Sequence, residues 1–280
     1  MSALTAPTQY VSVQGNRLAY RRFGKPSTIP LLFLTHFRGT MDLIDPLLLN
    51  SIASSRTIII FDNAGCGHSS GSIAPTIQEA GAIAVDFLNA IGVAKVDLLG
   101  FSMGGFIAQC ILLDYPHVVN KVVLAGTQST YTEGFTAPDA KVMELAGGAE
   151  PNEEDMMTLF FYPTKTSRAL GHAWWQRTQE RNVEGEGRTT FVDQAGGQVM
   201  NGAITQFVSD PGFFERLKQV DVPILVTNGK NDIMTPTANS FLMQQKLKNV
   251  ELHIYPDSGH GHLYQVPEAY AKQLEVFLGS

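Results

Sequence analysis

The most constraining feature of this chain is a serine flanked by glycines, at the point where an apolar run of strand length becomes a helical one. The stretch "LLGFSMGGFIAQC" (98–110) contains a G-x-S-x-G pattern centred on Ser102. Apolar residues run almost without a break through the join, so the turn must be tight. Glycines two positions to either side would let strand and helix pack closely, while the serine is held in a strained backbone conformation. Its hydroxyl would then lie above the sheet at a helix N-terminus, where backbone N–H groups favour negative charge.

Short apolar runs alternate with longer amphipathic stretches along most of the chain. This alternation is typical of βαβ units, and continuous apolar runs are typical of central strands covered on both faces. The expected strands lie at 10–13, 17–23, 29–35, 57–62, 95–100, 121–126, 222–229 and 250–256, the first two as an antiparallel hairpin. The expected helices lie at 43–54, 76–91, 103–114, 236–247 and 266–278. The pattern predicts an α/β fold with a mostly parallel eight-stranded sheet flanked by helices.

Residues 130–215 interrupt this alternation. They contain helical stretches, polar loops and aromatic clusters such as "LFFYP" and "AWW", but no apolar run of strand length. We therefore expect a mostly helical cap inserted after the sixth strand, between a first core segment, 1–129, and a second, 216–280. Trp174 and Trp175 are expected to line the underside of this cap and bind substrate. The alternative is that they belong to the insertion's own core.

Composition narrows the class of protein and of partner. Apolar residues make up 44% and charged residues 16% of the 280, which is typical of a globular chain, and no apolar stretch approaches the roughly 18 residues of a membrane span. Twenty basic against 26 acidic residues offer no basic patch for nucleic acid. We expect a small, largely uncharged substrate, and neither nucleic acid nor membrane as a partner; a homodimer is left open. The N-terminus lacks the features of a secretory signal and there are only two cysteines, so the expected location is cytoplasmic.

Several segments, in order, resemble those of the α/β-hydrolase superfamily. They are the entry hairpin, "LLFLTHFRGTMDLIDPLL", "IIIFDNAGCGHSSG", "VDLLGFSMGGFIAQ", "ILVTNGKNDIMTP" and "YPDSGHGHLYQVPEAYAKQLEVFL". The resemblance covers nearly the whole chain, and it is to the cap-containing hydrolases with a serine nucleophile rather than to one enzyme. It implies an α/β-hydrolase fold in which Ser102 stands on the nucleophile elbow. No cofactor is expected.

A serine hydroxyl needs a base within hydrogen-bond reach and a carboxylate that orients the base. In this fold the order along the chain is Ser, then Asp or Glu, then His. Asp232 and His260 each follow an expected strand, and the carboxyl ends of strands are where α/β sheets place ligands. His260 matches the family's G-H position, with His262 as the alternative base. Asp62 resembles a family aspartate that braces the site without titrating in catalysis.

An oxyanion needs two N–H donors. The resemblance implies that one is the backbone N–H of Met103. The other normally follows a His-Gly pair, from which "FLTHFRGT" departs. Without a gap the donor is Phe37; with a one-residue deletion it is Arg38, and we prefer the gap-free register. His36 would then lie near the site, where it either contacts substrate or makes a structural hydrogen bond.

These features together predict a serine hydrolase that cleaves an ester or lactone bond of a small, largely apolar molecule through an acyl-enzyme. The alternatives are hydrolysis of a carbon–carbon bond in a diketone-type substrate, or a non-hydrolytic enzyme or ligand receptor on the same scaffold, because fold does not fix function. No metal site is expected, since Cys66 and Cys110 lack further ligands at regular spacing.

Overall fold

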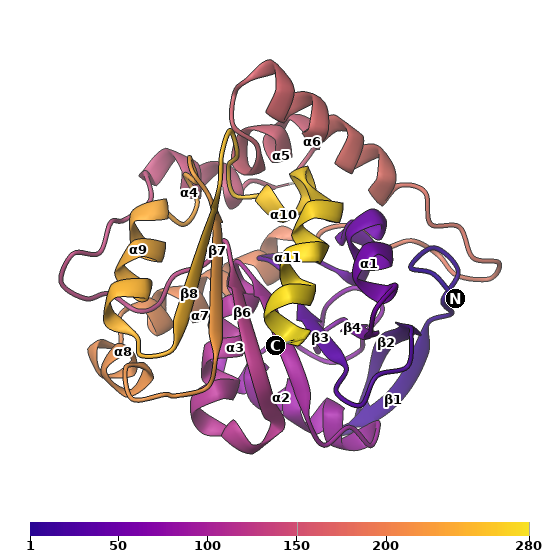
Figure 1. Ribbon diagram of the computed structural model, residues 1–280. Coiled ribbons are helices and arrows are strands. Elements are labelled where there is room, and N and C mark those ends of the chain that lie inside the picture. Colours follow the sequence, from indigo (N-terminus) through magenta and orange to yellow (C-terminus); the bar gives the residue numbers. More distant parts are fainter. Residues whose placement is uncertain (150, 280) are drawn as a thin grey trace.

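The computed structural model describes residues 1–149 and 151–279. Residues 150 and 280, which belong to the expected insertion and to the expected second core segment, lie outside the described residues. The described part forms an eight-stranded sheet in the order β1-β2-β4-β3-β5-β6-β7-β8 (Figure 1). The strands are β1 (Gln9–Val13), β2 (Asn16–Gly24), β3 (Leu31–Leu34), β4 (Thr57–Phe61), β5 (Val96–Phe101), β6 (Val119–Ala125), β7 (Ile224–Gly229) and β8 (Val250–Tyr255).

The sheet is mostly parallel, as predicted. Only β1 with β2 and β2 with β4 pair antiparallel, and every other neighbouring pair is parallel. Strands β3, β4 and β5 are buried along their whole length, because helices cover both faces of the sheet. Successive side chains of β3 enter different hydrophobic clusters: Leu32 packs in one and Phe33 in the other.

Helices cover the two faces of the sheet. On one face α2 packs against α3, and on the other α1 packs against α11 (Figure 1). The core helices are α1 (Pro46–Ala53), α2 (Ile77–Ala90), α3 (Met103–Asp114), α9 (Thr237–Lys246), α10 (His262–Gln265) and α11 (Pro267–Gly279), with 3-10 turns η1 (Met41–Leu43) and η2 (Pro116–Val118). Apart from the short turns and α10, these helices match the sequence prediction to within a few residues.

Between β6 and β7 the described chain contains helices and loops but no strand. The helices are α4 (Ala140–Ala146), α5 (Glu153–Phe160), α6 (Lys165–Thr178), α7 (Gln194–Val208) and α8 (Pro211–Leu217). Each begins at an Asp, Asn or Thr whose side chain accepts a backbone N–H of the first turn, which explains why polar loops punctuate this stretch. Helices α5 and α6 lie at the top of the view in Figure 1. The boundaries 130 and 215 stay a prediction, and α8 runs past the second.

The parallel strands bring four distant segments to one edge of the sheet. Residues 35–39 follow β3, Ser102 follows β5, Asp232 comes shortly after β7, and His260 shortly after β8. Because these are all carboxyl ends of parallel strands, the segments converge at the edge where α/β sheets bind ligands.

Candidate active site

Ser102 lies on a tight turn between β5 and α3. Its φ is +55°, in the left-handed region that L-residues rarely adopt. A side chain at Gly104 would overlap the carbonyl oxygen of Leu34, and one at Gly100 would overlap the backbone of Gly104. Helix α3 can therefore approach β3 and β5 this closely only because both positions are glycine.

Asp232 and His260 form a buried, hydrogen-bonded pair. The Nδ1 of His260 donates to Oδ2 of Asp232 over 2.8 Å, and neither side chain is exposed. The same carboxylate accepts the N–H groups of Met234 and Thr235, at 2.8 and 3.0 Å, and the hydroxyl of Thr235 at 2.7 Å. Burial alone would raise the pKa of Asp232, but the interaction with His260 and the bonds from Thr235 outweigh it and lower the pKa. The carboxylate thus stays ionised and holds the imidazole in one orientation.

The other ring nitrogen of His260, Nε2, is buried and has no hydrogen-bond partner in residues 1–149 or 151–279. His260 and Ser102 line the same small cavity, of about 30 Å³, although no hydrogen bond joins the two side chains in the described part of the chain. The rings of Phe101 and Phe160 contact the imidazole, with centroids 5.0 and 5.2 Å away, and limit its movement.

Two backbone N–H groups next to Ser102 are free to donate. Met103 is the first residue of α3, so its N–H has no acceptor within the helix. Phe37 follows β3, and its N–H likewise has no acceptor among the described residues. Both residues line a large cavity that also contains Ser102, and Phe37 lines the small cavity as well.

Arg38, the alternative donor, has a backbone N–H that likewise has no acceptor among the described residues, whereas its side chain is engaged. Arg38 adopts φ +59° and is almost fully buried. Its guanidinium donates to the carbonyls of Gly148, Ala149 and Val192, at 2.5, 3.0 and 2.6 Å, and its own carbonyl accepts the N–H of Val192 at 2.9 Å. Arg38 thereby fastens the loop after β3 to two segments between β6 and β7.

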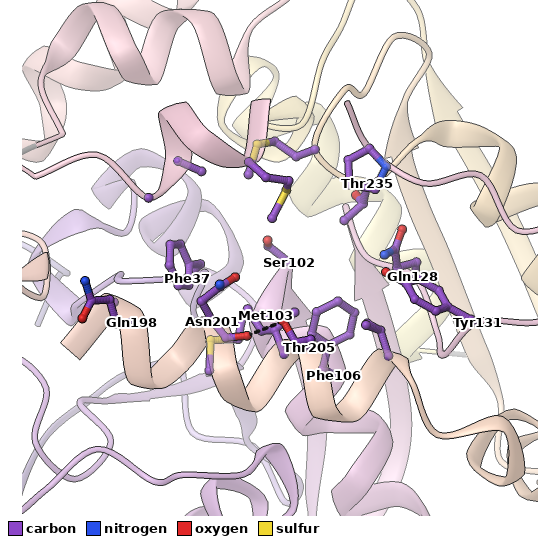
Figure 2. Close-up of a pocket in the computed structure, with 18 residues that line it drawn as sticks. Phe37, Ser102, Met103, Phe106, Gln128, Tyr131, Gln198, Asn201, Thr205 and Thr235 are labelled. Atoms are coloured by element: carbon purple, nitrogen blue, oxygen red, sulfur yellow. Dashed lines mark hydrogen bonds between the residues drawn. The ribbon is translucent and has the colours of Figure 1, made fainter. Parts of the chain in front are cut away.

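The large cavity, of about 440 Å³, opens above Ser102 (Figure 2). Helix α7 forms one wall, with Gln198, Asn201 and Thr205 on the face toward the cavity, and Gln128 and Tyr131 lie on another side. No charged side chain belongs to the lining in the part of the chain that the structure describes. The remaining lining residues are mostly apolar or glycine: Phe37, Met103, Phe106, Pro138, Met143, Ala146, Gly147, Gly197, Ile204, Val208, Met234 and Thr235, besides Ser102.

Trp174 and Trp175 do not lie on either cavity. Trp174 is fully buried, and its ring stacks on Tyr264 and Phe160 with centroids 5.2 and 5.7 Å away. Trp175 is partly buried and packs edge-on against Trp174. Because α6 turns this aromatic face toward the core, the two tryptophans lie in a hydrophobic cluster rather than facing Ser102. Phe160 does line the small cavity.

His36 lies beside the site, and the choice between the two registers stays a prediction. His36 is 4% exposed and lines the small cavity together with Ser102 and His260. Asp62 lies beneath this loop and accepts the N–H of Met41 at 2.7 Å and that of His68 at 2.9 Å, so it braces two turns.

Sequence reasoning missed the residues of α7 and Thr235. The polar face of α7 has the sequence pattern of an ordinary solvent-exposed helix face. Only the packing of α7 over α3 places this face toward Ser102. Thr235 could have been found from the run "NDIMTP", where a threonine three residues after Asp232 can bond back to it.

Within residues 1–149 and 151–279, no cluster of three or more His, Cys, Asp or Glu side chains is arranged to hold a metal ion. A search of the same residues for a helix both long and apolar enough to span a bilayer finds none.

Residues 29–265 match the family model for the alpha/beta hydrolase fold. A solved structure of an alpha/beta hydrolase fold protein from Chitinophaga pinensis is 37% identical, with a TM-score of 0.89 and full coverage of both chains.

Two curated relatives are more distant. The serine hydrolase BPHL of Homo sapiens is 23% identical, over 96% of this chain and 85% of its own. The poly(3-hydroxyalkanoate) depolymerase of Ectopseudomonas oleovorans is 26% identical, over 89% and 83%. With the matched model, the close structural relative and the sheet topology in agreement, this chain belongs to the α/β-hydrolase-fold family.

Proposed function

We propose that this protein is a serine hydrolase that cleaves an ester or lactone bond of a small, uncharged molecule through an acyl-enzyme intermediate. The observation that carries the proposal is the buried hydrogen bond from His260 Nδ1 to Asp232, which leaves Nε2 of the same ring as an acceptor in the cavity that Ser102 lines.

The proposed reaction begins when Ser102 Oγ attacks the substrate carbonyl and His260 Nε2 takes the hydroxyl proton. Asp232 stabilises the imidazolium without taking the proton itself. The negative charge that forms on the carbonyl oxygen is stabilised by the N–H groups of Met103 and Phe37. His260 then gives its proton to the departing alkoxide, and the C–O bond breaks. Water, deprotonated by His260, attacks the acyl-enzyme, and Ser102 recovers its proton as the acid leaves.

The uncharged lining of the large cavity supports a neutral substrate. A charged group there would lose hydration without gaining an opposite charge, which is unfavourable. Amide and hydroxyl groups of Gln198, Asn201 and Thr205 can bond polar, uncharged parts of a substrate. The name of the depolymerase relative, whose substrate is a polyester, is consistent with ester chemistry.

The test is active-site labelling with a fluorophosphonate probe. We expect the wild type to be labelled at Ser102 and Ser102→Ala to lose both labelling and activity while keeping its melting temperature. Ser129→Ala is the matched control, since Ser129 is also buried and its hydroxyl has no partner among the described residues. Labelling at another residue would overturn the assignment.

A panel of purified substrates then assigns the bond. Hydrolysis of p-nitrophenyl esters or lactones supports the proposal. Turnover of a vinylogous diketone alone would replace it with carbon–carbon bond hydrolysis, and no turnover by a chain that binds the ligands would favour a receptor.

A further inference from the structure

The imidazole of His36 lines the small cavity and also a second cavity of about 50 Å³, and its orientation is fixed by its contacts. Its ring contacts Phe101 and Phe160 edge-to-face, with centroids 5.7 and 5.3 Å away. A Cβ at Gly39 would lie 2.7 Å from Oγ1 of Thr35 and 3.0 Å from Cε1 of His36, so glycine lets the loop pass close to the ring. The Nδ1 atom is 2.9 Å from the carbonyl oxygen of Phe37.

That contact determines which nitrogen carries the proton. A carbonyl oxygen can only accept, so Nδ1 is the protonated donor and Nε2 is left as an acceptor. Nε2 is buried and has no donor in residues 1–149 or 151–279, as is also true of Nε2 of His260. Burial, helped by the neighbouring His260, lowers the pKa of His36 to about 4. At neutral pH it therefore accepts hydrogen bonds without taking up the proton.

We propose that Nε2 of His36 accepts a hydrogen bond from a hydroxyl group on the acyl part of the substrate, so that the protein prefers short hydroxyacyl esters to the corresponding unsubstituted esters. The inference rests on the proposed serine hydrolase function and specifies its substrate class. Hydroxyl is the fitting donor because an ammonium group would share the cavity with the cationic Arg38 and with apolar side chains such as Leu159 and Phe160.

The two cavities differ in exposure, and this difference assigns the acyl part and the alcohol part of an ester to one cavity each. Every residue that lines the small cavity is buried or partly buried, including Met156 and Leu159. The large cavity reaches Tyr131, which is 47% exposed, and Met143, which is 36% exposed. The alcohol must leave before the acyl-enzyme is hydrolysed, whereas the acyl group remains bound. We therefore assign the acyl group to the small cavity, beside His36.

An unpaired acceptor at this place gives selectivity. A substrate with the hydroxyl pairs Nε2, whereas a substrate without it leaves this buried acceptor unpaired, a difference of about 1 to 3 kcal/mol. That difference corresponds to roughly a fivefold to 150-fold difference in rate.

The experiment compares kcat/KM for p-nitrophenyl butanoate with that for its 2-hydroxy and 3-hydroxy derivatives. For the wild type we expect at least one hydroxy ester to react about fivefold faster or more than butanoate. His36→Asn keeps an N–H that can bond the Phe37 carbonyl but removes the acceptor at Nε2, so the ratio should fall close to one. His36→Gln places an amide oxygen near the position of Nε2 and should retain part of the preference. Butanoate is the internal reference, so losses from folding cancel in the ratio.

The outcomes separate the two proposals. If butanoate is hydrolysed but neither hydroxy ester is preferred, or if His36→Asn keeps the wild-type ratio, the role of His36 is wrong and the hydrolase function stands. If no ester is turned over and the fluorophosphonate does not label Ser102, the proposed function is wrong and the inference about His36 is overturned with it.

Discussion

At Phe37 the backbone and the side chain have separate roles that can be tested separately. If its N–H bonds the oxyanion, Phe37→Leu keeps the donor and should be tolerated. Phe37→Pro removes the N–H and should lower kcat about a hundredfold to a thousandfold, the usual effect of losing one oxyanion donor. The measurement is steady-state kinetics on an ester that the wild type hydrolyses.

Proline at this position also restricts His36, which precedes it. The kinetic result therefore counts only for a protein with a native circular-dichroism spectrum and an unchanged melting temperature. A folded Phe37→Pro protein with near-normal kcat would exclude this donor, and the backbone N–H of Arg38 would be tested next.

His260 and His262, the two histidines of "GHGH", differ in whether a ring nitrogen remains without a hydrogen-bond partner among the described residues. The sequence favours His260 over His262 by its place in the family pattern, and the contacts agree with that choice. His262 bonds the carbonyl of His260 through Nδ1 and the hydroxyl of Thr227 through Nε2, each at 3.0 Å. Neither nitrogen of His262 is available to a substrate or to Ser102, whereas Nε2 of His260 is.

At the scale of elements, α6 and α7 should respond differently to mutation. Trp174 on α6 is fully buried in an aromatic cluster, so Trp174→Ala should destabilise the fold by about 3 to 5 kcal/mol and lower the rates on all substrates together. Asn201 on α7 lines the large cavity and is exposed, so Asn201→Ala should leave the melting temperature nearly unchanged. It should alter relative rates across esters with different alcohol groups. A substrate-selective effect of Trp174→Ala at unchanged stability would contradict this division.

The sequence predicts strands and core helices better than it predicts the stretch between β6 and β7. Runs such as "TIIIF" are apolar on both faces, which only a covered central strand explains, and tight turns such as that at Ser102 have a strict glycine requirement. The aromatic residues of α6 carry no such information. The sequence of α6 is compatible with tryptophans that cover a substrate cavity and with tryptophans that pack on Tyr264. Only the tertiary packing determines which of the two contacts they make.

At the scale of the whole molecule, buried ionisable groups couple the stability of the fold to pH. Burial lowers the pKa of His36 to about 4 and that of His262 to about 3. Burial raises the pKa of Asp62 to about 6, although the N–H groups of His68 and Met41 partly oppose it. These groups titrate at different pH values in the folded and the unfolded chain, so each contributes to stability in its own pH window.

The two histidines make the fold sensitive to mild acid. In the unfolded chain the two histidines take up a proton near pH 6.5, whereas in the folded chain they stay neutral. Their contribution to the free energy of unfolding is therefore fully present above about pH 6.5 and is lost as the pH falls toward their folded pKa values. Asp62 acts in the opposite direction, because its folded form gains a proton at a higher pH than its unfolded form. Between about pH 7 and about pH 5, protonation of each histidine in the unfolded chain lowers the free energy of unfolding by about 2 kcal/mol. Protonation of Asp62 in the folded chain raises it by about 1 kcal/mol.

We therefore expect the free energy of unfolding to fall by about 2 to 3 kcal/mol between about pH 7 and about pH 5. Guanidinium denaturation at a series of pH values measures this directly. His262→Gln removes one titrating ring while keeping an amide that can bond Thr227 or the carbonyl of His260, so it should reduce the pH-dependent loss by about 2 kcal/mol even if it is less stable at neutral pH. His117→Gln is the matched control, because His117 is exposed and its side chain has no hydrogen bond or ion pair among the described residues, and it is expected to keep the wild-type slope. If the stability of the wild type is constant across this range, or if the His262→Gln slope equals that of His117→Gln, the buried neutral histidines do not control the acid sensitivity of the fold.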